Sequence, residues 1–106
     1  MTTIKNLSDE EFKDFVEKSE LALIDFYADW CGPCKIMKPM IDELSKEIEG
    51  VEFGKINVDQ NQENAVELGI MSIPTLLIFS KGKLVDRLTG AVPKETIRER
   101  LGKFID

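Results

Sequence analysis

Hydrophobic and polar positions along the chain follow two different periods, and the changes of period outline the expected elements. In the segment SDEEFKDFVEKS the two phenylalanines and the valine recur at helical spacing. Ser8 and Glu11 form the serine–glutamate pair of a capping box at the start of this segment. The pattern therefore predicts a helix over residues 9–18.

Short apolar runs predict the strands. LALIDFYA at residues 21–28, VEFGKINV at 51–58 and PTLLIF at 74–79 have the length and composition of buried strands. LVDRL at 84–88 alternates apolar and polar positions, as a half-exposed edge strand does. Because the tight turn SKGK joins the last two strands, we expect them to pair antiparallel.

Three further helices are predicted between and after the strands. The first follows the two cysteines and ends near Gly50, the second lies in NQENAVELG and stops at Gly69, and the third, VPKETIRERLGKFI, has Pro93 in its first turn. The apolar face of the first should carry Ile36, Met37, Met40, Ile41, Leu44 and Ile48, and that of the last Ile97, Leu101 and Phe104.

The alternation of strands and helices indicates an α/β fold, in which helical crossovers make parallel strand pairs. Together with the antiparallel pair, this predicts a mixed sheet of four or five strands with helices on both faces. The chain has 106 residues, enough for one domain with one core. We therefore expect a single domain over residues 1–106.

Composition and charge narrow the function. The chain is 42% hydrophobic and 32% charged, as in ordinary globular proteins. Its formal net charge of -6 disfavours nucleic acid and anionic membranes as partners, because both are bound through basic surfaces. The sequence has no apolar run of membrane-spanning length, and its start, MTTIKNLSDEEF, lacks the basic and apolar regions of a signal peptide. We therefore expect a cytoplasmic monomer.

The sequence contains two cysteines and no histidine. The absence of histidine excludes Cys–His nucleophilic catalysis and a Cys₂His₂ zinc site. Two cysteines cannot complete a four-thiolate zinc site within one chain, so no metal site is predicted. A disulfide scaffold is also disfavoured, because a bridge between residues three positions apart closes a very small loop.

Both cysteines lie in ADWCGPCKIM, residues 28–37, at the junction of a predicted strand and a predicted helix. Sheets of α/β proteins present their ligand sites at such junctions. A cysteine is often only a small buried apolar side chain, but this placement favours a redox pair. Residues three apart on a helix have Cβ atoms about 5–6 Å apart, and a disulfide needs about 3.5–4.5 Å. A small adjustment therefore forms or breaks the bond.

The residues around the cysteines suit thiol chemistry. Pro33 fits a first helical turn and stiffens the loop between the sulfurs, and Gly32 lets another polypeptide approach Cys31 closely. Cys31 is expected at the positive end of the helix dipole, which together with Lys35 favours its thiolate, the nucleophilic form. Cys34 lies one turn further on, and we expect it to be more buried and to stay a thiol until it reacts.

Two other residues are unusual in their surroundings. Asp25 lies in the apolar run LALIDFY, where burial should raise the pKa of its carboxyl. It either points outward at a strand end or accepts a proton behind Cys34, with Lys55 of the next strand as its electrostatic partner. Pro74 in MSIPTLL is either an ordinary first residue of a strand or a cis-proline.

Four segments together resemble the thioredoxin family: DFYADWCGPCK, KINVDQN, GIMSIPTLLIF and TGA, with Pro39 in the helix after the cysteines. A CxxC pair alone is weak evidence, but Trp-Cys-Gly-Pro-Cys-Lys followed at 73–75 by Ile-Pro-Thr is highly specific. The match covers essentially the whole chain. It departs from the family pattern at Tyr27, where tryptophan is common, and has Met71 at a variable position that borders the site.

The resemblance implies a thioredoxin fold and specific roles at the catalytic centre. Cys31 would be the exposed attacking nucleophile and Cys34 the resolving thiol. Asp25 would be the buried proton acceptor for Cys34, with Lys55 beside it. The implied activity is that of a protein-disulfide reductase whose redox centre is the reversible disulfide, without cofactor or metal. The implied partners are disulfide-containing target proteins and a thioredoxin reductase, dependent on NADPH and flavin or on ferredoxin.

The resemblance also implies how a target protein binds. Pro74 would be a cis-proline facing the cysteines, and Ile73 would offer backbone hydrogen bonds to an extended substrate. Pro39 would kink the helix that carries the cysteines. The flat apolar surface around the sulfur would be formed by Trp30, Gly32, Pro33, Gly90 and Ala91.

Three other functions fit parts of the pattern less well. An oxidase or isomerase of the same fold usually carries histidine within the CxxC, where this chain has Gly-Pro. A non-catalytic docking subunit would have no need of both cysteines and Asp25. A metal site shared between the CxxC pairs of two chains is disfavoured by the apolar Trp30 and Pro33 beside the thiols. Disulfide reduction is therefore the expected function.

Overall fold

The computed structural model describes residues 4–105, which form five strands and four helices. The strands are β1 (Lys5–Asn6), β2 (Leu21–Tyr27), β3 (Glu52–Asn57), β4 (Thr75–Ser80) and β5 (Lys83–Thr89). The helices are α1 (Asp9–Lys18), α2 (Gly32–Glu47), α3 (Glu63–Glu67) and α4 (Lys94–Gly102). Every predicted helix and strand is present. Only β1 has no predicted counterpart, because two residues are too few to show a period.

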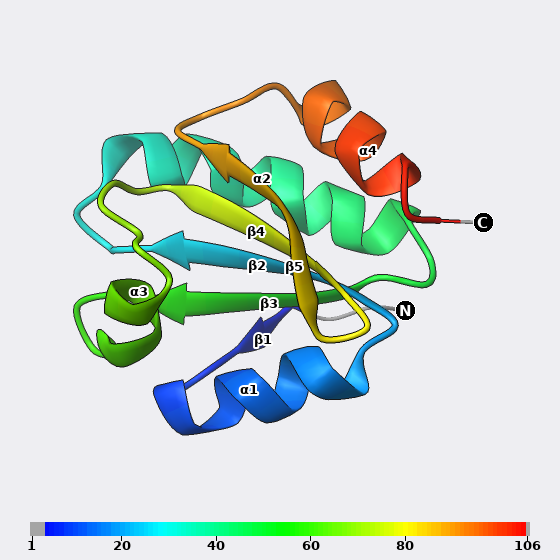
Figure 1. Cartoon of the computed structure of the whole chain (residues 1–106). Coiled ribbons are helices and arrows are strands. Elements are labelled where there is room, and N and C mark those ends of the chain that lie inside the picture. Colours follow the sequence, from blue (N-terminus) through cyan, green and yellow to red (C-terminus); the bar gives the residue numbers. More distant parts are fainter. Residues whose placement is uncertain (1–3, 106) are drawn as a thin grey trace.

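The sheet is mixed and has the strand order β1-β3-β2-β4-β5. β3 pairs parallel with β1 and β2, whereas β4 pairs antiparallel with both β2 and β5. Figure 1 shows α1 and α3 on one face of the sheet and α2 and α4 on the other. This arrangement confirms the predicted α/β fold with a mixed sheet and helices on both faces.

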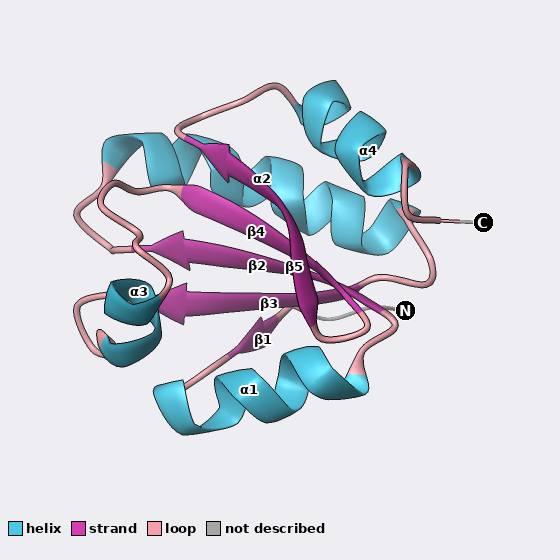
Figure 2. Ribbon diagram, viewed as in Figure 1, coloured by secondary structure: helices cyan, strands magenta, loops and turns pink. Residues whose placement is uncertain are grey.

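The direction of β4 decides where the loops meet. Because β4 runs opposite to β2, its first residue lies at the same edge of the sheet as the last residues of β2 and β3. α2 begins at this edge, as Figure 2 shows. The two described ends of the chain lie at the opposite edge (Figure 1). The loop that holds both cysteines is therefore far from both of these ends.

β2 is central and is covered on both faces, so consecutive side chains of this strand enter two different cores. The core beneath α2 and α4 includes Leu21, Leu23, Met37, Leu44, Ile97 and Leu101. The core beneath α1 and α3 includes Phe12, Val16, Ala22, Ile24, Phe26 and Ala65. This double burial explains why LALIDFY is an almost unbroken apolar run.

The predicted start of α1 is confirmed, and one prediction for α2 is wrong. The capping box of Ser8 and Glu11 is complete, with the Glu11 N–H donating to Ser8 Oγ and the Ser8 N–H to the Glu11 side chain. Ile36 was assigned to the apolar face of α2, yet it is 60% exposed. Met37 and Ile41 define the buried face, and a residue next to Met37 is turned about 100° away from it.

The closing helix is shorter than predicted. Pro93 is the N-cap of α4 and not a residue of its first turn, and the helix ends at Gly102. Phe104 lies beyond the helix, although its ring still packs half-buried against the same core as Ile97 and Leu101. In the described part of the chain no helix is long and apolar enough to cross a membrane.

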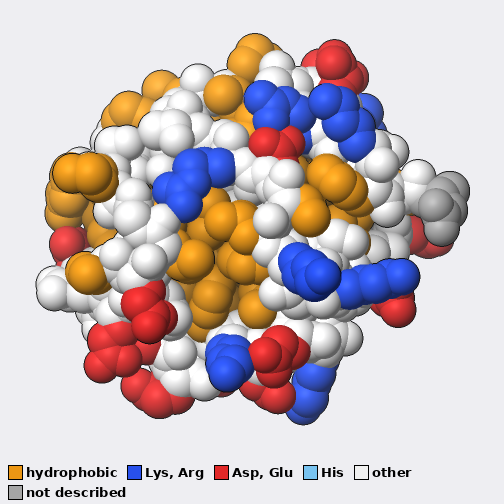
Figure 3. All heavy atoms as spheres, in the orientation of Figure 1, with side chains coloured by type: hydrophobic (Ala, Val, Ile, Leu, Met, Phe, Trp, Pro, Cys, Tyr) orange, Lys and Arg blue, Asp and Glu red, His pale blue; other side chains and the backbone are white. Residues whose placement is uncertain are grey.

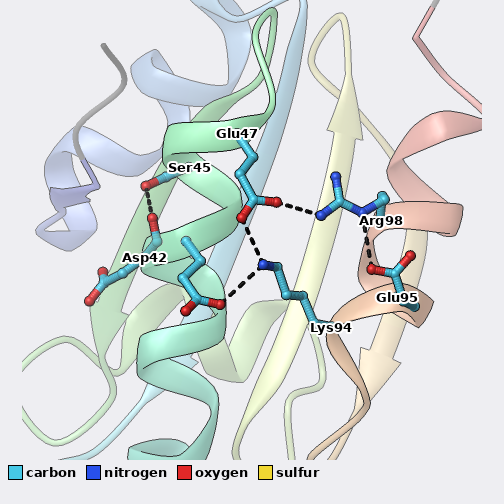
Figure 4. Close-up of polar contacts among 7 residues, drawn as sticks. Asp42, Ser45, Glu47, Lys94, Glu95 and Arg98 are labelled. Atoms are coloured by element: carbon cyan, nitrogen blue, oxygen red, sulfur yellow. Dashed lines mark hydrogen bonds and ion pairs between the residues drawn. The ribbon is translucent and has the colours of Figure 1, made fainter.

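A network of ion pairs joins α4 to α2 on the surface (Figure 4). Lys94 Nζ lies 3.1 Å from Glu43 Oε1 and 2.8 Å from Glu47 Oε2. Arg98 pairs with Glu47 and, at 3.2 Å, with Glu95 of its own helix. Two contributions therefore connect α4 to the helix that carries the cysteines: the burial of Ile97 and these ion pairs at the surface.

Candidate active site

The two cysteines form a disulfide at the start of α2, with their Cα atoms 5.2 Å apart. Cys31 is the N-cap residue, and Gly32 and Pro33 are the first residues of the helix. Proline is tolerated there because the N–H that it lacks has no partner within the helix. The Cys34 N–H donates to Cys31 Sγ at 3.2 Å. A backbone donor and the helix N-terminus thus both favour negative charge on this sulfur.

The expected contrast in burial between the cysteines is wrong for the disulfide form. Cys31 is 4% exposed and Cys34 is 6% exposed, so the residue expected to be more buried is not. Both pack with the buried Ala28 and with the half-buried Ile73. The burial of Cys31 therefore depends in part on Ile73, a residue of the loop before β4.

The loop before β4 lies directly against the disulfide. The Ile73–Pro74 peptide bond is cis, which decides the alternative left open by the sequence. The carbonyl oxygen of Ile73 lies 3.8 Å from Cys31 Sγ. Thr75, the first residue of β4, donates from its hydroxyl to the carbonyl of Ser72 at 2.7 Å and so fixes the loop from within.

A second loop, after β5, is attached to the first. The Gly90 N–H donates to the carbonyl of Pro74 at 2.8 Å. Gly90 has a positive φ of 84°, a backbone conformation that residues other than glycine rarely adopt. Ala91 follows as an exposed residue. The structure therefore brings the predicted residues of three distant segments to one edge of the sheet.

Asp25 is buried behind the disulfide. It is 7% exposed, and its Oδ1 atom has no hydrogen-bond partner among the described residues. A cleft of about 220 Å³ is lined by both Asp25 and Cys34, and also by Lys55. Desolvation raises the pKa of the Asp25 carboxyl to about 7, against the opposing charge of Lys55. The structure thus excludes the alternative in which Asp25 points outward at a strand end.

Lys55, suggested by the sequence as an electrostatic partner of Asp25, is its register partner on the neighbouring strand. The two groups do not share a hydrogen bond at Oδ1, which accepts none from the part of the chain that the structure describes. Lys55 therefore acts on the Asp25 carboxyl through the field of its charge and not as a hydrogen-bond donor to that oxygen.

The sequence did not reveal how Trp30 is held. Its indole Nε1 donates to Asp59 Oδ2 at 2.7 Å, across the gap between the loops that follow β2 and β3. Asn57 supports this contact, because its side-chain oxygen accepts from the Asp59 N–H at 2.9 Å and its amide donates to Asp29 at 3.4 Å. Trp30 and Asp59 lie in loops that follow different strands, so no local pattern in the sequence could indicate their contact.

The surface around the disulfide is apolar. Trp30, Gly32, Pro33 and Ala91 are exposed, and Met71 adds an almost fully exposed side chain from the loop before β4. Figure 3 shows apolar side chains along the edge of the molecule at which α2 begins. Such a surface can pack against another polypeptide. In residues 4–105 no group of three or more His, Cys, Asp or Glu side chains is arranged to hold a metal ion.

A disulfide between the N-cap and the first turn of a helix, with an acidic group behind it and an apolar surface around it, defines a thiol–disulfide oxidoreductase. The two sulfurs can exchange their bond with another dithiol by thiol–disulfide exchange. The site residues predicted from the sequence lie together at one edge of the sheet.

Comparison with known proteins identifies the family. The thioredoxin family model matches residues 3–103. The thioredoxin of Synechocystis sp. is 47% identical over 107 residues, covering 99% of this chain and 100% of that protein. The thioredoxin of Pyropia yezoensis is 45% identical, covering 97% and 98%. A solved structure of Plasmodium falciparum thioredoxin has 34% identity and a TM-score of 0.89, covering 96% of this chain and 100% of the other.

The chain belongs to the thioredoxin family, and its activity is protein-disulfide reduction by dithiol–disulfide exchange. Two classes of partner follow in general terms from this membership: proteins that carry a disulfide, and a reductase that restores the dithiol. None of the other functions weighed for the sequence is favoured by the structure or by these relatives.

Proposed function

We propose that the two cysteines divide the exchange reaction between them. The Cys31 thiolate attacks one sulfur of a target disulfide, and the other target sulfur leaves as a thiolate. Cys34 then loses its proton and attacks Cys31 Sγ, which breaks the mixed disulfide and releases the second target thiolate. The target gains two electrons and leaves as two thiolates that take up protons from the solvent, while this protein gives up the Cys34 proton and keeps the Cys31–Cys34 disulfide.

The observation that carries this division is the position of Cys31 as the N-cap of α2 with the Cys34 N–H on its sulfur at 3.2 Å. A backbone donor and a helix N-terminus lower the pKa of a thiol, so Cys31 supplies the thiolate. Cys34 is already at bonding distance in the mixed disulfide, which makes its attack intramolecular and fast.

We assign the proton of Cys34 to Asp25. The carboxyl is buried, has an unpartnered oxygen and lines the same cleft as Cys34. A base works best when its pKa lies near the working pH, and burial raises the pKa of Asp25 to about 7. Lys55 lowers this pKa by its charge and keeps the group ready to ionise.

We propose that the target lies across the apolar surface formed by Trp30, Gly32, Pro33, Gly90 and Ala91. We place Pro74 beside the disulfide, because the carbonyl oxygen of the preceding residue, Ile73, lies 3.8 Å from Cys31 Sγ. An extended segment of the target that entered here could form hydrogen bonds with Ile73 while its sulfur met Cys31. This mode uses main-chain hydrogen bonds and is therefore tolerant of target sequence.

We further propose that the Cys31–Cys34 pair is the whole redox centre, with no cofactor or metal, and that the protein works as a cytoplasmic monomer. A reducing compartment suits a protein that removes disulfides. Its reductase draws either on NADPH through a flavin or on ferredoxin. Comparing turnover with each reducing system tests the type of reductase. Sedimentation of the reduced and oxidised protein tests whether it is a monomer.

The direct test of the division of roles uses Cys34→Ser. This variant should retain the attack by Cys31 and stop at the mixed disulfide. A disulfide-containing target should then accumulate as a covalent complex that dithiothreitol cleaves. Cys31→Ser is the matched control and should form no complex. If Cys34→Ser released reduced target at the parent rate, Cys34 would not be the resolving thiol.

A further inference from the structure

Three polar side chains lie on one face of the sheet, beneath α2. Asp25 and Tyr27 are two residues apart on β2 and therefore point to the same face. Lys55 is directly opposite Asp25 on β3. All three line the cleft of about 220 Å³ that also contains Cys34. They form a polar group at the end of a face whose other members, such as Leu23, are apolar.

The ammonium of Lys55 lies over the aromatic ring of Tyr27, with its Nζ 5.6 Å from the ring centroid. A cation at this distance is attracted to the negative face of the ring. Within residues 4–105 no hydrogen bond reaches Oδ1 of Asp25 from Lys55 or from any other group. The contact of the ammonium with the ring is therefore available to hold it near the carboxyl.

The charges around Asp25 come from several elements. From α2, Lys35 and Lys38 line the cleft, and Asp29 lines it from the loop after β2. β4 places the apolar Leu76 opposite Asp25. Among these cations Lys55 is the one whose charge opposes the effect of burial on the carboxyl.

The pKa of the Tyr27 hydroxyl is also affected by the neighbouring carboxylates. Burial first, and then the charges of Asp29 and Asp25, raise the pKa of the Tyr27 hydroxyl, while a hydrogen bond with Asn57 opposes this. The phenol therefore remains neutral in the physiological range, and the ring keeps the electron-rich face that attracts a cation.

We propose that the ring of Tyr27 is a positioning element that holds the Lys55 ammonium beside Asp25 and thereby sets the proton affinity of that carboxyl. The importance of this for the reaction rests on the proposed role of Asp25 as proton acceptor. A lysine released from the ring would extend into the open part of the cleft, and the carboxyl would lose the charge that favours its ionised form. Tyr27 acts through Lys55 and does not itself touch the sulfurs.

The test compares Tyr27→Met, which removes the ring, with Tyr27→Phe, which keeps it and removes only the hydroxyl. The Asp25 carboxyl is titrated by carbon-13 NMR in the oxidised full chain. Tyr27→Met should raise the pKa of Asp25 by a fraction of a unit, because an ammonium that leaves the ring lowers that pKa less than one held beside the carboxyl. Tyr27→Phe should leave that pKa close to the parent value.

Lys55→Gln supplies the second variant, because it removes the cation without changing the ring. It should raise the pKa of Asp25 at least as far as Tyr27→Met does, and adding Tyr27→Met to it should have no further effect. The proposal is overturned if Tyr27→Met lowers the pKa, if Tyr27→Phe shifts it equally, or if the effect of Tyr27→Met persists without Lys55.

The titration does not depend on the exchange reaction, so it separates this proposal from the proposed function. The same variants are assayed for the pH dependence of target release from the mixed disulfide. A pH profile that follows the titration supports both assignments. A titration that moves as expected beside an unchanged profile supports the positioning of Lys55 and removes Asp25 from the mechanism.

Discussion

Trp30 shows how much of the site depends on single contacts between distant residues. Its indole is largely exposed, yet its N–H is held by the carboxylate of Asp59 in another loop. The Asn57 side chain in turn holds the backbone of Asp59. One carboxylate therefore fixes the orientation of the largest apolar side chain beside the disulfide.

We expect Asp59→Ala to free the Trp30 side chain and weaken target binding. The apolar surface would lose its fixed shape, and KM for a protein disulfide should rise a few-fold with little change in kcat, since the sulfurs are untouched. Insulin reduction at varied substrate concentration measures this. Asp59→Asn keeps an acceptor oxygen, so its KM should lie between that of the parent protein and that of Asp59→Ala. An unchanged KM in Asp59→Ala would show that the orientation of Trp30 has no part in binding.

The residues of the catalytic centre could be predicted from the sequence when their surroundings were local. Burial of Asp25 was one of two alternatives that its apolar neighbours in the strand left open, and the structure confirms that one. The isomer of the Ile73–Pro74 bond stayed open, because proline before a strand is compatible with both. The burial of Cys31 was misjudged, because it depends on a loop 42 residues away.

At the scale of elements, the two-residue strand β1 pairs with β3 at a glycine that has no room for a side chain. Lys5 pairs with Gly54, and a Cβ at Gly54 would lie 2.7 Å from Leu7 Cδ1, with Ile24 Cδ1 and Phe15 Cε1 each at 3.2 Å. The glycine therefore leaves space that the core side chains of α1 and its neighbours fill.

Gly54→Ala should consequently destabilise the protein by about 1–3 kcal/mol, the usual cost of adding a carbon to a packed core. Urea unfolding monitored by circular dichroism measures the change. Gly102→Ala is the matched control, because a Cβ there meets nothing within 4 Å and alanine favours a helix. A Gly54→Ala variant as stable as the control would mean that Leu7 and Phe15 move aside freely.

The ion pairs between α4 and α2 allow a second prediction at this scale. Lys94 contacts both Glu43 and Glu47, and the three groups are largely at the surface, so screening limits their effect. Lys94→Met should lower the thermal midpoint slightly at low ionic strength, and the difference should disappear in molar salt. Lys46→Met, on the exposed side of α2, is the control. A difference that salt leaves unchanged would point to packing of the lysine stem instead.

Element prediction from the sequence succeeded where the pattern is repeated over several residues. Helix α1 begins and ends as its capping box and apolar spacing indicate. The end of α4 could not be predicted as well, because Phe104 packs on the core without being helical and so continues the apolar pattern beyond Gly102. An apolar residue at position 104 is expected both from a continuing helix and from a non-helical segment packed on the core, so the sequence does not distinguish them.

At the scale of the whole molecule, Asp25 makes stability depend on pH. Its carboxyl has a pKa of 3.8 as an ordinary group and about 7 in the folded chain. The folded state therefore binds more protons than the unfolded state between these values, and the free energy of unfolding falls as the pH rises from about 4 to 7. The difference of about three units sets an upper limit of roughly 4 kcal/mol on this loss.

Asp25→Asn removes the charge that causes the loss. We expect the oxidised variant to be more stable than the parent by roughly 2–4 kcal/mol at pH 8, with the difference vanishing toward pH 3. Urea unfolding at several pH values measures it. Asp29→Asn, an exposed carboxylate at the same cleft, is the control. A gain for Asp25→Asn that is equal at pH 3 and pH 8 would contradict the linkage to ionisation.

The two described ends of the chain lie at the edge opposite the disulfide (Figure 1). Any surface or partner domain attached near Ile105 would therefore stand behind the molecule and leave the sulfurs facing outward. Immobilised on a bead through that end, the protein should reduce dissolved disulfides about as fast as it does in solution. Attached through a side chain near Trp30, it should lose this ability toward proteins while still reacting with small disulfides. The fold thus provides a point of attachment near Ile105 that is separate from the edge of the sheet at which the disulfide lies.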